Sequence, residues 1–271
     1  AQIQGVREKF PDEILVALNN RNPELHDIYR INIRSGARTL LQRNDKYAGF
    51  VTDDDYKVRF AQVFRPDGGM DLLRRTDAGA FEPFESIGAE DSLTTSPIGF
   101  DKTATHVYLM DSRGRDTSAL FSQDLATGAK TLIAEDPRAD AVVVLTHPRE
   151  KTIQAVSVNY DRVRWQIADQ GIEADLKYLQ SATDGEVAVL SRTTDDTRWV
   201  VAYIKDEGPV RYYLYDRPAH MARFLFTNRP ALESAKLAKM HPVETKARDG
   251  LTLVSYLTLP VWSDPDGDGR P

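Results

Sequence analysis

Few side chains in this sequence have the type and spacing that catalysis or metal binding requires. The five histidines are widely scattered, and none has a second histidine at metal-ligand spacing; they are His26, His106, His147, His220 and His241. His106 begins a predicted strand and His220 lies in a predicted turn, and we interpret all five as structural or solvated side chains. The chain has no cysteine, which excludes disulfides, thiolate catalysis and cysteine-ligated zinc.

Clustered carboxylates are the other candidates for chemistry. Asp53–Asp55 and Asp195–Asp196 fall in predicted loops between strands, where we interpret them as solvated acidic turns. The tail from Asp264 to Gly269, Asp-Pro-Asp-Gly-Asp-Gly, resembles the start of a calcium-binding loop, in which alternating carboxylates converge on the ion. Because Pro265 interrupts that pattern and no glutamate stands at the twelfth position, a flexible interdomain loop is the favoured interpretation.

The remaining candidates are aromatic. The three tryptophans, Trp165, Trp199 and Trp262, are most simply core or interface residues. No paired acids or clustered histidines mark a lyase or glycosidase site in the sequence. We therefore assign no catalytic, cofactor-binding or metal-binding residue, and we predict no cofactor.

Composition limits the partners. The net charge of −6 and the isoelectric point near 5.5 argue against a nucleic-acid partner, because no basic stripe is present to displace counterions. Apolar residues make up 41% and charged residues 28%, the balance of a soluble globular protein. No apolar run approaches the roughly 18 residues that span a bilayer, so no membrane partner is predicted. Residues 1–10 lack a signal-peptide core. The domain order and the absence of cysteine slightly favour a periplasmic over a cytoplasmic location.

The sequence also repeats. Residues 118–134 read as a strand, a tight turn and a second strand, with Gly128 supplying a turn position where φ can be positive. The phrase recurs at intervals of 44 or 48 residues, centred on Asn32, Thr76, Asp124, Ala168 and Asp216. Such a regular interval is typical of a repeat protein.

Strand patterns fill these repeats in groups of about four. The predicted strands are Ile14–Leu18, Asp27–Ile33, Arg38–Gln42, Tyr47–Thr52, Val58–Arg65, Met70–Arg75, Phe81–Ile87, Ser96–Phe100, His106–Met110, Ser118–Gln123, Lys130–Ala134, Ala141–Leu145, Ile153–Asn159, Val163–Ala168, Glu186–Ser191, Trp199–Ile204, Tyr212–Tyr215 and Arg223–Phe226. Four antiparallel strands every 45 or so residues is the period of a β-propeller blade. A β-sandwich has no reason to keep this register, and a leucine-rich solenoid needs a period of about 20–29 residues. The predicted fold is therefore an all-β propeller.

About five blades fit into residues 12–230. An open propeller leaves two sheet faces exposed to solvent, and Ala1 leads almost directly into a repeat. We therefore expect the chain to start partway round a larger ring. One segment interrupts the strands: Gly171–Gln180 places Ile172, Leu176 and Leu179 at helical spacing. We predict a short amphipathic helix that covers the side of one blade.

The pattern changes after Pro230. Ala231–Met240 is a polar, alanine-rich stretch without strand alternation. A hairpin follows, with a strand at Val243–Ala247, a turn at Arg248–Gly250 and a longer strand at Leu251–Leu259. The expected divisions are a partial propeller over 1–230, a connector over 231–242 and a separate C-terminal segment over 243–271.

The hairpin and the segment before it resemble sequences of a known family. Residues 243–260, with their Arg-Asp-Gly turn and the ending Tyr-Leu-Thr-Leu-Pro, are similar to the start of the hydrolase domain in serine peptidases of the prolyl oligopeptidase family. Residues 212–232, from Tyr-Tyr-Leu-Tyr-Asp-Arg to Pro-Ala-Leu, resemble the last propeller blade on the acylaminoacyl-peptidase and dipeptidyl-aminopeptidase side of that family. The resemblance implies a propeller of seven or eight blades and an α/β-hydrolase domain whose first hairpin lies within 243–271.

The resemblance also implies a function. Family members cleave short peptides by acyl transfer through a serine in a Gly-x-Ser-x-Gly elbow, and their propeller admits only peptides to the active site. This sequence stops at Pro271 without such an elbow, so no catalytic residue is carried over and we expect the chain alone to be inactive. The implied partners are short peptides and a C-terminal hydrolase domain; homo-oligomerisation stays open. The alternative is a non-catalytic, TolB-like propeller that serves as a protein-binding module.

The strand Leu251–Leu259 carries one more prediction. Without the rest of a hydrolase sheet it is a long apolar edge with unpaired backbone groups. We expect it to fold against the propeller, to pair with another copy or to be poorly ordered.

Overall fold

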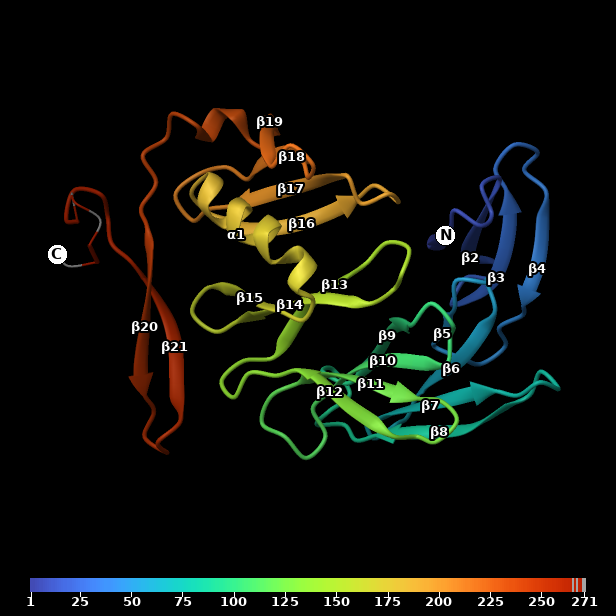
Figure 1. The fold of residues 1–271 in the computed structure, drawn as a ribbon. Coiled ribbons are helices and arrows are strands. Elements are labelled where there is room, and N and C mark those ends of the chain that lie inside the picture. Colours follow the sequence, from blue (N-terminus) through green and yellow to red (C-terminus); the bar gives the residue numbers. More distant parts are fainter. Residues whose placement is uncertain (265, 267, 270–271) are drawn as a thin grey trace. The chain divides into compact units, whose positions relative to one another are not determined.

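The structure is a computed structural model of the 271-residue chain and describes all residues except 265, 267, 270 and 271 (Figure 1). The described residues form five antiparallel sheets, a separate two-stranded hairpin, one α-helix and two short 3-10 helices. They belong to two compact units, residues 1–141 with 150–152 and residues 142–149 with 153–271. No described helix has the length and apolar content needed to cross a membrane.

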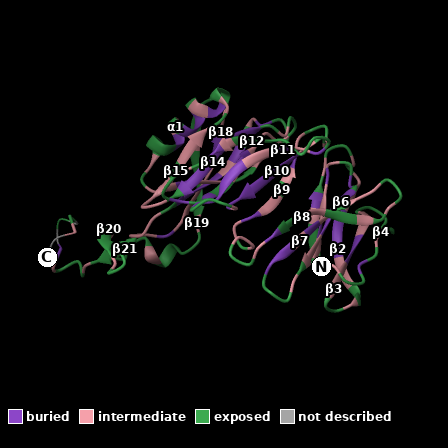
Figure 2. Cartoon of the chain, turned by 90° about the horizontal axis from the view of Figure 1, so that it is seen from below, coloured by how far each residue is buried: buried purple, intermediate pink, exposed green. Residues whose placement is uncertain are grey.

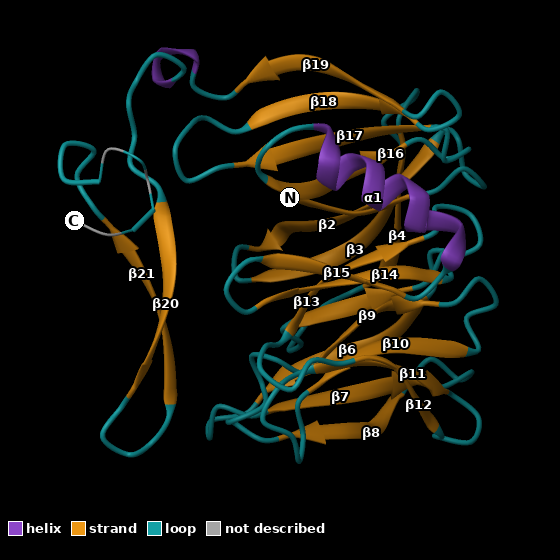
Figure 3. Cartoon of the chain, turned by 60° about the vertical axis from the view of Figure 1, so that its left-hand side comes forward, coloured by secondary structure: helices purple, strands orange, loops and turns teal. Residues whose placement is uncertain are grey.

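Five consecutive sheets account for most of the chain (Figure 3). Sheet 1 contains β1 (Gln2–Val6), β2 (Glu13–Asn22), β3 (Leu25–Asn32) and β4 (Arg38–Gln42); sheet 2 contains β5 (Gly49–Thr52), β6 (Val58–Phe64), β7 (Met70–Arg75) and β8 (Phe81–Ile87); sheet 3 contains β9 (Ser96–Phe100), β10 (His106–Asp111), β11 (Ala119–Asp124) and β12 (Lys130–Ala134); sheet 4 contains β13 (Ala141–Thr146), β14 (Ile153–Asn159) and β15 (Val163–Ile167); sheet 5 contains β16 (Glu186–Arg192), β17 (Arg198–Ile204), β18 (Arg211–Asp216) and β19 (Met221–Thr227). In each sheet, successive strands are antiparallel neighbours, which is the blade arrangement of a β-propeller. The predicted fold class is confirmed for these five sheets.

Two details of the strand prediction change. Strand β1 was not expected, because the prediction began the first blade at residue 12; it pairs with β2 across a register shift between Ile3 and Gly5. This irregularity interrupts the alternation that would reveal the strand in the sequence. Sheet 4 has three described strands, and α1 (Glu173–Ala182) follows the third of them.

The C-terminal hairpin is confirmed but shifted. Strands β20 (Met240–Lys246) and β21 (Thr252–Thr258) have seven residues each and pair in register, whereas the prediction made the second strand longer. Strand β20 begins inside the predicted connector, despite Pro242. Proline lacks an N–H and is tolerated on an edge strand such as this one. A short 3-10 helix, η2 (Pro230–Leu232), follows sheet 5.

Burial follows the middle strands of the sheets, and the hairpin is mostly exposed (Figure 2). In the first unit, Leu15, Ile28, Val58 and Ala61 of β2, β3 and β6 form one buried cluster. Leu15 and Ala17 of β2 both belong to this cluster, because a strand turns every second side chain to the same face. Each such buried aliphatic side chain contributes about 1.5–3 kcal/mol.

The repeated tight turn has one physical basis in sheets 1, 3 and 5. The Asp124 carboxylate accepts hydrogen bonds from the N–H groups of Ala126 and Thr127 at 2.8 Å each. Asn32 holds its turn in the same way, and Gly36 and Gly128 have φ values of 72° and 76°. In sheet 5 the corresponding position is His220, with φ 47°. The turn chemistry predicted from the repeat is therefore present, with a histidine in the left-handed position of the last copy.

A second repeated turn connects the first two strands of sheets 2 to 5. Each turn contains one non-glycine residue with φ between 54° and 60°: Tyr56, Ala104, Lys151 and Asp196. Asp53 and Asp101 open two of these turns, and their carboxylates accept backbone N–H groups within the turn. Non-glycine residues in this conformation are uncommon and stay there only when side-chain hydrogen bonds or packing hold the turn.

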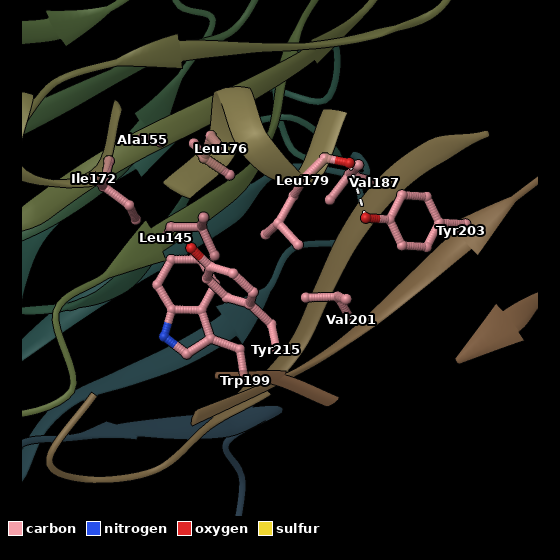
Figure 4. Close-up of a cluster of buried hydrophobic side chains, with 10 residues drawn as sticks. All are labelled: Leu145, Ala155, Ile172, Leu176, Leu179, Val187, Trp199, Val201, Tyr203 and Tyr215. Atoms are coloured by element: carbon pink, nitrogen blue, oxygen red, sulfur yellow. Dashed lines mark hydrogen bonds between the residues drawn. The ribbon is translucent and has the colours of Figure 1, made fainter. Parts of the chain in front are cut away.

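The core of the second unit joins α1 to sheets 4 and 5 (Figure 4). Ile172, Leu176 and Leu179 are buried against Trp199 and Tyr215, which confirms the predicted amphipathic helix; η1 (Gln170–Ile172) precedes α1. The other members of the cluster are Leu145, Ala155, Val187, Val201 and Tyr203. The Tyr203 hydroxyl donates to the Leu179 carbonyl at 2.8 Å, and burial raises the pKa of Tyr203 to about 12.

Candidate functional site

Each of the two ends of sheet 5 carries a cluster of charged side chains. In an antiparallel meander, the β16–β17 and β18–β19 turns lie at one end, and the β17–β18 turn lies at the other, where the chain also leaves β19. We call the first the distal end and the second the hairpin end, because the connection from β19 to β20 starts there.

At the distal end, Arg217 and Tyr215 hold a helix carboxylate. The Tyr215 hydroxyl donates to Asp175 Oδ1 at 2.7 Å, and Arg217 Nε donates to Asp175 Oδ2 at 2.8 Å. Asp175 is in the first turn of α1 and is buried. Burial, together with the neighbouring Asp175 carboxylate, raises the pKa of Tyr215, so its hydroxyl stays protonated and acts as a donor.

Asp196 extends this network into the β16–β17 turn. Its carboxylate accepts from Arg192 Nε at 2.6 Å, from Trp199 Nε1 at 2.8 Å and from Arg217 Nη1 at 2.6 Å. The Arg192 guanidinium also lies 4.6 Å from the centre of the Trp199 ring. The interpretation of Asp196 as a solvated turn residue is wrong: two arginines on the same sheet compensate its charge, which allows the carboxylate to be buried.

A shallow cavity of about 400 Å³ opens over this network. The residues described around it are Gly171, Ala174, Asp175, Asp195, Asp196, Thr197, Arg217, Pro218 and His220, which include no serine or cysteine. Hydrogen bonds from Thr193 and Thr197 lower the pKa of Asp195 to about 2. Because the Asp175 and Asp196 oxygens all have donors inside the protein, the arrangement supports the fold rather than a reaction.

At the hairpin end, Asp206 and Arg162 hold the start of β20. Asp206 lies in the β17–β18 turn, and its Oδ2 accepts from Met240 N at 2.8 Å and from Arg162 Nη2 at 3.2 Å. Arg162 also donates to the Met240 carbonyl. A cavity of about 240 Å³ beside them is lined by Arg162, Asp184, Gly185, Glu186, Ile204, Lys205, Asp206 and Lys239.

The predicted acidic turn Asp53–Asp55 lies in the first unit and is only partly solvated. Asp53 is buried against Arg59, at 3.0 Å, which corrects its interpretation as solvated. Asp54 pairs with Arg7 and, at 3.3 Å, with Lys151, and Asp55 pairs with Lys9. The three carboxylates thus connect the β5–β6 turn to Arg7, Lys9, Arg59 and Lys151 of the same unit.

A further buried cluster in the first unit centres on Asp111. Burial alone would raise the pKa of Asp111, but hydrogen bonds from Arg113 and Lys130 outweigh that effect and hold the pKa well below its usual range. Arg113 also donates to Glu85 at 2.6 Å. Glu85 lies in β8, Asp111 in β10 and Lys130 in β12, and Arg113 is the second residue after β10, so the cluster ties sheet 2 to sheet 3.

The structure keeps the five histidines in separate elements. His106 Nε2 lies 3.6 Å from the Asp124 carboxylate, and His241 Nε2 lies 3.6 Å from the Asp264 carboxylate. Among the described residues of the tail, the carboxylates of Asp264, Asp266 and Asp268 lie within 4.8 Å of one another. The Asp264 carboxylate is buried and accepts the N–H groups of Asp268 and Gly269; Pro265 and Gly267 lie outside the described residues.

The three tryptophans differ in how far they are buried. Trp199 is fully buried and Trp165 is half-buried, with its Nε1 donating to the Val187 carbonyl at 3.2 Å, so both agree with the predicted packing role. Trp262 is 85% exposed, so it is not a core residue. An interface role for Trp262 stays a prediction.

Comparison with known proteins places the chain. Dipeptidyl aminopeptidase BIII of Pseudoxanthomonas mexicana is 48% identical over 271 residues, which is all of this chain and 39% of that protein. The chain is a homologue of dipeptidyl aminopeptidases of the prolyl oligopeptidase family. Dipeptidyl peptidase family member 6 of Caenorhabditis elegans is 30% identical over 274 residues, 95% of this chain and 37% of that protein. This homologue thus spans less than two fifths of the length of the relatives it matches, and no family model matches it.

Solved structures support the same fold. A prolyl endopeptidase structure aligns with a TM-score of 0.56 at 14% identity, covering 90% of this chain and 37% of that one. Dipeptidyl peptidase 4 of Porphyromonas gingivalis aligns with a TM-score of 0.54 at 9% identity, covering 89% and 36%. At these identities the likeness concerns the fold alone. The resemblance predicted from residues 212–260 is confirmed.

Proposed function

We propose that this chain is the substrate-gating propeller portion of a serine peptidase of the prolyl oligopeptidase family. The peptidase would remove dipeptides from the amino ends of short peptides, by acyl transfer through a serine on a hydrolase domain. The observation that carries the proposal is the 48% identity to a dipeptidyl aminopeptidase over the whole chain. The chain alone would be inactive, because its sequence has no Gly-x-Ser-x-Gly elbow.

The division of labour follows from the fold. The blades of a propeller surround a central channel. A channel too narrow for folded proteins would let the sheets of this chain exclude large substrates. The proposed domains are the propeller over 1–230, a connector over 231–242 and the start of a hydrolase domain over 243–271. Short peptides and that hydrolase domain would be the partners.

The hairpin β20–β21 supports this division. Two strands alone are marginally stable in water, and a larger sheet normally covers such a hairpin. Leu251, Leu253 and Tyr256 are 65%, 50% and 42% exposed. These apolar side chains and the free edge of β21 would be covered by the strands of the hydrolase domain.

A fusion enzyme tests the proposal. This chain replaces the 271 aligned residues of the Pseudoxanthomonas relative, and the unchanged relative is the positive control. We expect the fusion to hydrolyse dipeptidyl 4-nitroanilides and to leave a folded protein uncut, and the unfused chain to release no nitroaniline. The relative's hydrolase part without any propeller should lose the discrimination against folded protein.

The contradicting outcome is equally concrete. A fusion that folds, reacts with a serine-directed fluorophosphonate and still fails on every dipeptidyl nitroanilide would overturn the proposed activity. Retained size discrimination without a propeller would overturn the gating role. Either result would favour the alternative, a propeller that binds a protein without catalysis.

A further inference from the structure

The hairpin β20–β21 is held against turns of sheets 4 and 5 at the first residue of β20. Met240 donates its N–H to Asp206 at 2.8 Å, and its carbonyl accepts from Arg162. Arg162 donates at the same time to Asp206 at 3.2 Å. One arginine and one aspartate therefore bind both backbone groups of a single residue, at the point where the connector becomes a strand.

The second strand of the hairpin is held by the same turn of sheet 4. Tyr256 of β21 donates its hydroxyl to the Asp161 carbonyl at 2.8 Å. The Arg162 guanidinium lies 5.9 Å from the centre of the Tyr256 ring. Asp161 and Arg162 are neighbours in the β14–β15 turn, so this turn contacts both β20 and β21. Two contacts on different strands fix the direction of a hairpin, whereas one contact would leave it free to swing.

The charges around Asp206 make the contact specific. The Lys205 ammonium lies 2.8 Å from Asp184 and 3.2 Å from Glu207. The Asp206 side chain is 13% exposed; its Oδ2 accepts from Arg162 and Met240 N, and its Oδ1 accepts from Glu207 N at 3.1 Å. A hydrogen bond to a charged group is stronger than a neutral one and is costly to leave unmade in a partly dry site.

We propose that Arg162 and Asp206 are positioning residues that set the angle at which the β20–β21 hairpin leaves sheet 5. We call this pair, together with Met240, the clasp. The consequence for catalysis rests on the proposed function: the segment that follows the hairpin would carry the serine, so the clasp would determine where the reacting groups lie relative to the channel. A displacement of about 1 Å at a reacting centre lowers rates by about a hundredfold, so loss of the clasp would affect turnover.

Hydrogen exchange on the chain itself tests the clasp without any activity. The substitutions are Asp206→Ala and Arg162→Ala, and the matched control is Asp184→Ala, which removes a carboxylate from the same cavity without touching the hairpin. We expect amides of residues 241–258 to exchange about tenfold faster in the two clasp variants, and amides of 199–203 in sheet 5 to keep their protection. Unchanged exchange over 241–258, or hairpin amides that exchange freely before any substitution, would overturn the clasp.

The fusion enzyme tests the positioning role. We expect Arg162→Ala to lower kcat several-fold with KM and the unfolding midpoint unchanged, and Arg162→Lys to restore part of the rate, because lysine keeps the charge but cannot bridge two acceptors as a guanidinium does. A kcat loss that merely follows a fall in the unfolding midpoint would overturn positioning. If the unsubstituted fusion is inactive, the proposed function fails, while the exchange experiment still decides whether the clasp exists.

Discussion

The two ends of sheet 5 use the same pair of side chains, arginine and aspartate, in different surroundings. At the distal end, the Asp196 and Arg192 side chains are 4% and 7% exposed. At the hairpin end, Asp206 is 13% and Arg162 is 40% exposed. The distal pairs hold α1 and two turns of one sheet together, while the hairpin pair joins the sheets to a separate two-stranded element.

This difference in burial indicates a different role for each end. A buried ion pair is expensive to break, because removal of one partner leaves an uncompensated charge in a poor solvent for ions. A half-exposed pair is cheaper to open, because water can replace a lost partner. We therefore expect the ion pairs of the distal end to stay formed. The contact of Arg162 and Asp206 with β20 should be able to break without unfolding sheet 5. The predictions below test that contrast, beginning with the largest effect.

Arg217→Ala should produce the largest loss of stability. It removes the donor shared by Asp175 and Asp196 and leaves both buried carboxylates short of a partner. We expect the free energy of unfolding to fall by about 3 kcal/mol, measured by urea denaturation of the chain. The control is Lys177→Ala, which removes an exposed helix pair with Glu173 and should cost less than about 0.5 kcal/mol. Equal losses for the two variants would show that the distal network does not behave as a buried one.

Acid should weaken the contact between Asp206 and β20, with a smaller effect on stability than Arg217→Ala. Burial would raise the pKa of Asp206, but the hydrogen bonds from Met240 N and Arg162 outweigh burial and lower it. A lowered folded-state pKa means that the stabilisation is complete above the ordinary aspartate value of about 3.9 and is lost as the pH falls through the folded-state value. We expect it to amount to about 1–2 kcal/mol.

Asp206→Asn isolates that carboxylate. At pH 6 the variant should expose amides 241–258 to exchange more than the unsubstituted chain does, after correction for intrinsic rates. As the pH is lowered below about 4 the two proteins should become progressively alike, because Asp206 loses its charge as the pH falls through its lowered folded-state pKa. A difference that stays constant down to the pH at which the chain unfolds would contradict the role of the ionised group.

The contrast between the two ends was only partly visible in the sequence. Strands such as β7, β12 and β14 were predicted with the observed bounds, because alternation and turn chemistry are local signals. The helix was found for the same reason, since Ile172, Leu176 and Leu179 lie on one face. The fold class therefore followed from periodicity alone.

The ionic sites were missed because their partners are distant in the chain. Asp196 follows another aspartate in a turn, which favours a solvated interpretation, and its partner Arg217 comes 21 residues later. Asp206 is 44 residues from Arg162. A signal was available for one pair only: Arg192 precedes Asp196 by four residues. Burial of a charge depends on such tertiary partners, which no local pattern encodes.

The smallest effect concerns the turn that closes the distal end. His220 occupies the position that Gly36 and Gly128 occupy in sheets 1 and 3, and it adopts a left-handed backbone that costs a non-glycine residue about 1–2 kcal/mol. Its Nδ1 lies 3.1 Å from the Tyr215 hydroxyl, a contact that the glycine turns lack. His220→Ala removes that contact and keeps the strain, whereas His220→Gly removes both. We therefore expect His220→Gly to be more stable than His220→Ala by about 1 kcal/mol in urea denaturation.

Gly36→Ala is the matched reverse change. A Cβ at Gly36 meets no atom within 4 Å, so the substitution changes the backbone energy alone and should cost about 1 kcal/mol. If His220→Ala proves at least as stable as His220→Gly while Gly36→Ala is destabilising, the sheet 5 turn is not strained. The histidine would then be accommodated by the geometry of the distal end itself rather than retained through its contact with Tyr215.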